Sequence, residues 1–216
     1  MKTAAMGFGL AILAAAPALA AAPTIDNDRV TVWDVKLAPG ESAPATVHDL
    51  DTVIMFLEGG TIRTVAGGKT TTATRKFGDA VFVPAGTDAV DTLVSGGPAH
   101  EVVVALKPHA VPSAIPNTTG LPNAFPRDGV VSVLNNDRVL VWHYAWVPGK
   151  PTAMHFHDKE VVVAYHQDGP LTSITPDGKR VVNPYKSGQL VFNRANRIHQ
   201  ELLVGPPQSA MMMELK

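Results

Sequence analysis

The strongest constraint on the fold is an internal repeat, because a duplicated segment must build the same unit twice. Residues 27–40 read Asn-Asp-Arg-Val-Thr-Val-Trp-Asp-Val-Lys-Leu-Ala-Pro-Gly, and residues 136–149 read Asn-Asp-Arg-Val-Leu-Val-Trp-His-Tyr-Ala-Trp-Val-Pro-Gly. Both stretches begin with Asn-Asp-Arg-Val, carry a Trp at the same place and end in Pro-Gly. Each copy spans about 85 to 90 residues, the size of a single small β-barrel. The chain is therefore predicted to contain two similar domains.

Both copies show the pattern of short strands separated by tight turns. Residues 51–57, 99–106 and 160–166 are rich in β-branched residues, and pairs such as Gly-Gly and Asp-Gly separate such runs. Long helical periodicity is absent, and the 216 residues include 18 Gly and 18 Pro, which suits a chain with many turns. We predict an all-β protein.

The repeat and the composition divide the chain into four segments. Between residues 107 and 126 the sequence holds five Pro residues and little periodicity, which indicates a linker rather than a strand. The predicted segments are an export signal (residues 1–22), a first barrel (23–107), a Pro-rich linker (108–126) and a second barrel (127–216).

Candidate metal ligands gather in the second copy. His155, His157 and Glu160 stand close together, and His199 follows after a long gap. Alternate side chains of an extended strand share a face, so His155 and His157 are expected to point the same way. Glu160 could join them across a local turn or bulge, and His199 would have to come from a distant strand. Three imidazoles and one carboxylate form a ligand set for a divalent transition metal.

The segment around the first three ligands resembles the first sequence motif of the cupin superfamily. That motif is a Gly, five residues, His-x-His, three or four residues and a Glu, followed later by a Gly. Gly149, His155, His157, Glu160 and Gly169 keep this order. Two residues rather than three or four separate His157 from Glu160, and the gap from Glu160 to Gly169 is longer than usual.

The segment before His199 resembles the second cupin motif, which is a Gly, five residues, Pro-x-Gly, two residues and a His. Gly188 and His199 keep the spacing, while Arg194 replaces the Pro and Asn196 replaces the Gly. Asn tolerates a positive φ better than most residues, so that replacement is mild. The first copy keeps Pro-x-Gly at residues 84–86. The resemblance implies two tandem jelly-roll β-barrels in one chain, a bicupin.

The first copy has lost most of the ligand set. Its residues at the places of His155, His157, Glu160 and His199 are Thr46, His48, Asp51 and Ala89. One His and one Asp are a poor set for a divalent metal, so we predict a single metal, held by the second barrel. The candidate ions are Fe, Mn, Ni, Co, Cu and Zn. The Irving–Williams order favours Cu or Zn if the metal is bound after export.

Three residues are candidates for a catalytic role: Glu160, His166 and Arg194. Arg194 could clamp an anion at the barrel mouth, since a guanidinium suits carboxylates; the alternative is a solvated loop residue. Strand alternation from Glu160 would turn His166 inward as an acid–base group, and the alternative is a residue at a strand end. Tyr144 and Tyr165 could line the pocket or pack the barrel. The run of Met residues at 211–213 is expected to be a packed last strand rather than a metal motif.

The N-terminus has the pattern of an export signal. Lys2 precedes the apolar, Ala-rich residues 6–16, and Ala-Leu-Ala at 18–20 has the small-x-small form of a cleavage site. We therefore expect export to a bacterial periplasm or beyond, with no stable membrane anchor after processing. The chain contains no Cys, so it has no disulfides. Its net charge is −1 and it has no basic run, which argues against nucleic acid as a partner.

The cupin resemblance implies a metal-dependent enzyme acting on a small, anionic or enolic molecule. Plausible reactions are dioxygenation, decarboxylation, isomerisation and β-elimination, and we favour dioxygenase-type oxidoreductase chemistry over lyase chemistry. The alternative is a non-catalytic protein that binds a small ligand, or binds metal for stability. Cupins host many reactions, so the motifs do not name the substrate. The oligomeric state also stays open, with a homodimer as one possibility.

Overall fold

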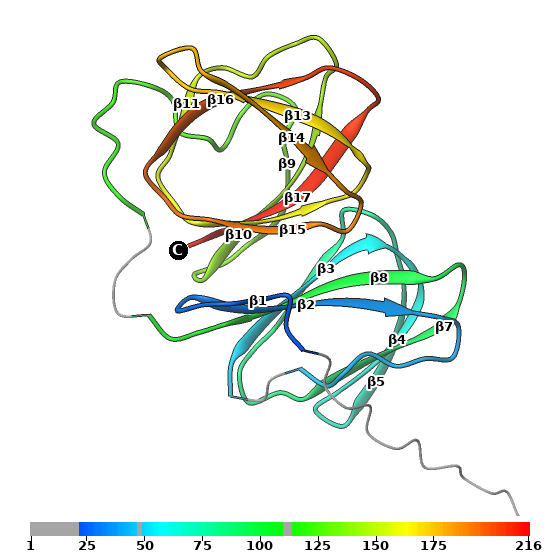
Figure 1. Ribbon diagram of the computed structural model, residues 1–216. Helices are drawn as coiled ribbons and strands as arrows, with labels where there is room; N and C mark the ends of the chain where they lie inside the picture. The colour runs from blue at the N-terminus through cyan, green and yellow to red at the C-terminus, as the bar shows by residue number, and fades with distance from the viewer. Residues whose placement is uncertain (1–21, 47–48, 110–113) are drawn as a thin grey trace, which may run out of the picture.

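The computed structural model describes residues 22–46, 49–109 and 114–216 and places 17 strands in four sheets (Figure 1). No helix occurs in these three ranges, and the prediction of an all-β fold is confirmed. Among the described residues, no helix could cross a membrane. Residues 1–21 of the predicted export signal, and His48, lie outside the described residues.

The first barrel consists of two facing sheets, with strand orders β1-β2-β8-β3-β6 and β5-β4-β7. Its strands are β1 (Ile25–Asp26), β2 (Val30–Leu37), β3 (Asp51–Glu58), β4 (Gly60–Ala66), β5 (Lys69–Arg75), β6 (Ala80–Val83), β7 (Ala89–Ser95) and β8 (Ala99–Leu106).

The second barrel also has two sheets, with strand orders β15-β12-β17-β10-β9 and β11-β16-β13-β14. Its strands are β9 (Val131–Asn135), β10 (Val139–Trp146), β11 (His155–His157), β12 (Val161–Tyr165), β13 (Gly169–Ile174), β14 (Arg180–Tyr185), β15 (Leu190–Asn193), β16 (Arg197–Leu203) and β17 (Gln208–Leu215).

The two barrels share strand register as well as sequence. In the first, β2 pairs with β8 so that Trp33 lies opposite Val103. In the second, β10 pairs with β17 so that Trp142 lies opposite Met212, at matching places of the repeat. Register in a sheet is set by which side chains must be buried, so matching register means that corresponding residues face corresponding surroundings. Residues can therefore be compared between barrels position by position.

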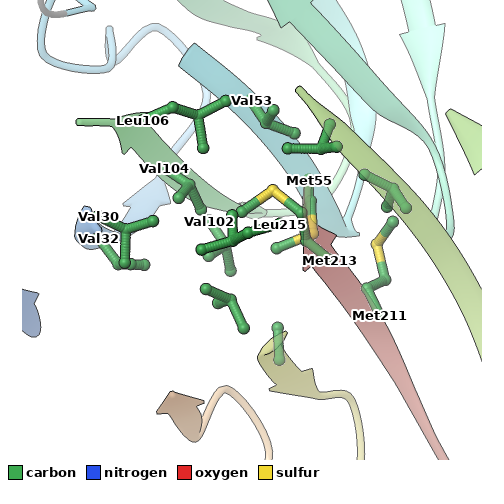
Figure 2. Close-up of a cluster of buried hydrophobic side chains, with 14 of the residues drawn as sticks. Val30, Val32, Val53, Met55, Val102, Val104, Leu106, Met211, Met213 and Leu215 are labelled. Atoms are coloured by element: carbon green, nitrogen blue, oxygen red, sulfur yellow. The ribbon is translucent and has the colours of Figure 1, made fainter. Parts of the chain in front are cut away.

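The five-stranded sheets of the two barrels pack against each other and share an apolar core (Figure 2). The first barrel contributes residues such as Val53, Met55 and Val104, and the second contributes Met211 and Met213. All five side chains are fully buried. Because burial of apolar area drives association, this layer fixes the barrels relative to each other. Each barrel has a further core in its own interior.

The last strand of each barrel is buried on both faces. Every residue of β8 and of β17 is buried. On β17, Met211 and Met213 face the shared layer, whereas Met212 belongs to the core of the second barrel. A strand that is buried on both faces has apolar residues at consecutive positions rather than at alternate ones, which explains the three consecutive Met residues. This packing agrees with the expectation that the Met run is a packed last strand.

The segment that joins the barrels is partly packed on the second barrel. Ala124 is fully buried and Phe125 is 5% exposed, and both belong to that barrel's core. The amide N of Phe156 donates to the Pro122 carbonyl and the amide N of Ala124 donates to the Phe156 carbonyl. The Pro-rich stretch predicted as a linker therefore also covers part of the second barrel, beside β11.

Two ion pairs cross the interface between matching positions of the repeat. Arg29 of the first barrel pairs with Glu160 of the second, with 3.1 Å between Nε and Oε2. Arg138 of the second barrel pairs with Asp51 of the first. Arg29 corresponds to Arg138, and Asp51 corresponds to Glu160, so the two pairs are related by the pseudosymmetry of the repeat. The side chains of Arg29 and Glu160 are 5% and 10% exposed, whereas that of Arg138 is 40% exposed.

We predict that Glu160→Gln lowers the free energy of unfolding by about 3 kcal/mol, because it removes the carboxylate charge that pairs with the buried guanidinium of Arg29. The matching change Asp51→Asn should cost less than about 1 kcal/mol, because Arg138 can turn to solvent. Denaturant unfolding of both variants measures the difference. Equal losses would show that burial does not distinguish the two pairs.

A buried carboxyl group lies inside the first barrel. Glu101 on β8 is fully buried, and neither of its carboxyl oxygens has a hydrogen-bond partner in the described structure. Burial raises the pKa of Glu101 to about 8; the nearby Asp91 also raises it, and Arg75 lowers it. The group is therefore protonated in the folded state at neutral pH but ionised in the unfolded chain.

This difference predicts that folding loses stability as the pH rises. Below about pH 4.5 both states hold the proton, and between there and about pH 8 only the folded state does, so unfolding releases a proton and becomes easier. The variant Glu101→Gln should remove a pH-dependent loss of a few kcal/mol, since a tenfold difference in proton affinity corresponds to about 1.4 kcal/mol. Unfolding at pH 5 and pH 8 tests this. Asp137→Asn, at an exposed position, is the control, and a parallel pH dependence in all three proteins would contradict the prediction.

Candidate metal centre

The structure brings three of the four predicted ligands together. His155 and His157 lie on β11 with one residue between them, and β11 pairs with β16 so that His155 faces His199. The Nε2 atom of His157 lies 3.2 Å from that of His155 and 3.1 Å from that of His199. Among the described residues, these three form the group whose ligand atoms lie within 4.8 Å of one another. We call them the His triad.

The rings are held so that their Nε2 atoms converge. The Nδ1 atom of His155 lies 2.8 Å from the Ala153 carbonyl oxygen, which can only accept, so Nδ1 carries the proton and Nε2 keeps its lone pair. The Nδ1 atom of His199 lies 3.1 Å from Ser173 Oγ. The Nε2 atom of His157 contacts the Nε2 atoms of both other rings, and the single proton that a neutral imidazole could carry there cannot make a full hydrogen bond to each of them. A cation at their centre would accept all three lone pairs, so the donor set fits a transition metal.

Burial keeps the triad neutral. It lowers the pKa of His199 to about 4, lowers that of His155 and lowers that of His157 strongly. Neighbouring cationic side chains, among them Arg197 and Arg127, lower these pKa values further. Metal ligation needs the unprotonated imidazole, so the rings are ready to bind an ion at neutral pH without first losing protons.

A carboxylate that sequence reasoning missed lies beside the triad. Glu201 follows His199 by two residues on β16 and therefore shares its face. Its Oε2 atom lies 3.0 Å from Arg127 Nη2 and accepts a hydrogen bond of 3.1 Å from Trp146 Nε1. Burial alone would raise the pKa of Glu201, but Arg127, His199 and His155 lower it to about 2. Glu201 is thus a fixed negative charge. The sequence signal was the His-x-Glu spacing on a strand.

A cavity of about 310 Å³ opens on the triad inside the second barrel. His157 and His199 form part of its wall, with Glu201 beside them. Its apolar lining includes Val161, Val163 and Met212, and its polar lining includes Ser173, Asn183, Tyr165, Tyr185 and Arg197. The rings of Tyr165 and Tyr185 stack with centroids 3.7 Å apart. A few convergent polar groups in an apolar hollow are typical of a small-molecule site.

The structure does not bring Glu160 to the triad, and its predicted role as the fourth ligand needs correction. Glu160 precedes β12, and Val161, the next residue, lines the cavity. Neighbouring residues of a strand point to opposite faces, so a shift of one residue turns the carboxylate outward. It pairs with Arg29 and accepts a 2.7 Å hydrogen bond from Arg194 Nη1. The short spacing after His157 was the sign of this shift.

Arg194 lies on the outer side of the barrel, between the two domains. Its Nη2 atom donates a 2.6 Å hydrogen bond to Asp28 of the first barrel, and its Nη1 atom donates to Glu160. These two carboxylates raise its pKa. The predicted roles of Arg194 as an anion clamp and of Glu160 as a catalytic group do not agree with these contacts. Arg194 instead bridges the barrels.

His166 also lies at the interface between the barrels and not in the cavity. It follows Tyr165, which lines the cavity, so alternation turns His166 outward. Its ring stacks on Phe77 of the first barrel, with centroids 3.8 Å apart and planes 12° apart. Its Nδ1 lies 2.6 Å from Gln167 Nε2. The predicted acid–base role does not agree with this position, because Glu160, from which alternation was counted, itself points outward.

In the first barrel, residues at the positions that match the predicted ligands make other contacts. Thr46 Oγ1 accepts a 3.0 Å hydrogen bond from the amide N of Ala89, at the positions that match His155 and His199. Asp51 is engaged with Arg138. Thr46 and Asp51, at two of the positions that match the ligands, are thus engaged in contacts within the fold, and His48 lies outside the described residues.

Comparison with known proteins supports the fold. No family model matches the chain. The Beta-alanine degradation protein BauB of Pseudomonas aeruginosa is 35% identical over 81 residues, which cover 38% of this chain and 80% of that protein. AerE from Microcystis aeruginosa superimposes with a TM-score of 0.65 at 12% identity, covering 88% of each chain.

Further solved structures show the same fold. A cupin 2 conserved barrel domain protein from Leptotrichia buccalis has a TM-score of 0.54 at 13% identity, covering 89% of this chain and 86% of its own. Oxalate decarboxylase of Bacillus subtilis, studied for its Mn(II) centres, has 0.61 at 12%, covering 87% and 69%. Salicylate 1,2-dioxygenase from Pseudoaminobacter salicylatoxidans, solved with gentisate, has 0.59 at 12%, covering 87% and 68%. The chain therefore has the fold of these cupin proteins, with two such barrels in tandem.

Proposed function

We propose that this protein is a metal-dependent enzyme that transforms a small organic molecule inside its second barrel. The convergence of three Nε2 atoms on a cavity of about 310 Å³ carries the proposal. His155, His157 and His199 would hold one divalent transition metal. Three protein ligands leave about three positions of a six-coordinate ion for water or substrate, one more than the predicted four-ligand site would leave.

The ion would supply Lewis-acid or redox chemistry to a molecule in the cavity. The chain's own residues would do the rest. Glu201 would balance the positive charge of the ion from a fixed place, because Arg127 and Trp146 hold its carboxylate. The apolar wall of Val161, Val163 and Met212 would exclude water from one side.

Among reaction classes we favour dioxygenation, followed by decarboxylation. The support is the likeness in fold to a salicylate dioxygenase and an oxalate decarboxylase, together with the cavity beside the triad. A ligand-binding role without turnover is the second candidate. The cavity beside the triad supports both, whereas it gives no support to a metal that serves stability alone.

We also propose that the protein acts after export and removal of its first 20 to 22 residues, on the pattern of an apolar run followed by Ala-Leu-Ala. Intact-mass measurement of protein purified from its source cells tests this. A mass that includes Met1 would contradict it.

The prediction for metal content distinguishes the residues of the His triad, which are expected to bind the ion, from Glu160, which is not. Purified protein should contain one divalent metal per chain, and His157→Ala or His199→Ala should abolish stoichiometric binding, because each leaves two imidazoles. Glu160→Gln should keep full metal content, because its carboxylate pairs with Arg29 and Arg194. Elemental analysis after dialysis measures all four proteins. Full occupancy in His199→Ala, or loss in Glu160→Gln, would contradict the assignment.

Activity is then tested on the metal-loaded protein. A panel of small acids, enols and phenols should reveal a substrate that is consumed by the wild type, with or without uptake of oxygen, and not by His157→Ala. Oxygen uptake would distinguish dioxygenation, and release of carbon dioxide without oxygen uptake would distinguish decarboxylation. Metal-dependent binding without any turnover would favour the ligand-binding role instead.

A further inference from the structure

Arg197 is the charged group in the cavity that the contacts described above leave without a counter-ion. It begins β16, two residues before His199 and four before Glu201, and β11–β16 pairing places it opposite His157. Residues with this spacing share the inward face of the strand. Arg197 therefore lines the same cavity as the triad.

The guanidinium is oriented but not neutralised. Its Nε atom donates a 3.1 Å hydrogen bond to the Arg194 carbonyl oxygen, which fixes the plane of the group. Within the described residues, no ion pair or side-chain hydrogen bond is made by its Nη1 and Nη2 atoms. The neighbouring arginines differ: Arg127 is paired with Glu201, and Arg194 with Asp28.

The two barrels differ at the position of Arg197 as well as at positions of the His triad. The position that matches Arg197 in the first barrel is Thr87, and the position that matches His199 is Ala89. The second barrel thus has both the imidazoles and the guanidinium, and the first barrel has neither at these positions. A partly buried cation without a carboxylate partner costs free energy, and a ligand that carries a negative charge would offset that cost.

We propose that Arg197 receives the carboxylate of the substrate, which is a small organic acid. Its Nη1 and Nη2 atoms form the planar fork that binds a carboxylate through two hydrogen bonds. The acid would lie between Arg197 and the triad, with its body against Val161, Val163 and the stacked Tyr pair. This inference rests on the proposed function, because it assumes that the cavity beside the triad is where the ligand binds.

The test uses acids paired with neutral amides of the same shape, on metal-loaded protein: acetate with acetamide, pyruvate with pyruvamide and benzoate with benzamide. Calorimetry should show binding of at least one acid and at least tenfold weaker binding of its amide. Arg197→Gln should weaken that acid by roughly 10- to 100-fold and leave the amide and the metal content unchanged, because the loss is one charge-assisted contact.

Two arginines serve as controls. Arg180 is exposed on β14, and the side chain of Arg194 points to Asp28 and Glu160, so Arg180→Gln and Arg194→Gln should keep wild-type affinity for the acid. Equal affinity for acid and amide, no binding of any acid at millimolar concentration, or unchanged acid affinity in Arg197→Gln would overturn the inference.

The outcome is separable from that of the proposed function. Binding of an acid that depends on Arg197 in a protein without turnover would support this inference and defeat the enzyme. Metal-dependent turnover of a neutral substrate at the same rate in Arg197→Gln would support the enzyme and defeat this inference.

Discussion

The apolar layer between the two five-stranded sheets is the constraint on which the rest of the structure depends. It requires one face of β8 and of β17 to be apolar, while the opposite face of each strand looks into its own barrel. The last strand of each barrel therefore has no exposed face on which to place a charge without cost. Glu101 and Glu214, which stand on the inward faces of these strands, both have raised pKa values, with burial as the largest cause. The layer also brings Arg29 and Arg138 to carboxylates of the opposite barrel, so the ion pairs depend on packing that apolar residues have already set.

The architecture could be predicted from the sequence because neither the internal repeat nor the alternation of side chains along each strand depends on the conformation of the loops. The two Asn-Asp-Arg-Val strands take matching registers, and the His-x-His pair shares a face with His199 as strand alternation requires. The joining segment was harder, since Ala124 and Phe125 lie in a stretch whose five Pro residues suggest a linker, yet they are buried against the second barrel. The composition of such a segment shows that it cannot form a central strand, but it does not show which surface of the barrel the segment covers.

The site was predicted in part, and the errors on Glu160 and His166 have one physical origin. Strand alternation makes a side chain's direction depend on an exact count, and the count between His157 and Glu160 is one residue shorter than the cupin pattern. That single residue places Val161 at the cavity and sends Glu160 to Arg29. The direction of the His166 side chain was predicted by alternation from Glu160, so it was wrong for the same reason. Arg194 was a different case, because its partner Asp28 is far away in sequence, and no pattern in one chain reports such a contact. Arg197 and Glu201, by contrast, could have been found by counting from His199.

The balance of charge inside the second barrel gives the duplicated fold its asymmetry. At the place of Glu201 the first barrel carries Asp91, whose pKa is raised by burial and whose Oδ1 accepts a hydrogen bond from Thr64. In the second barrel Arg127 and the hydrogen bond from Trp146 hold Glu201 ionised, and Glu214 has a raised pKa beside Trp142. One firm negative charge thus faces two guanidinium groups, before any divalent ion is counted. An excess of positive charge in a partly enclosed cavity favours the binding of an anion. The first barrel has Thr46, Ala89 and Thr87 at the positions of His155, His199 and Arg197, so it lacks this excess of positive charge and contributes to the fold through the shared layer.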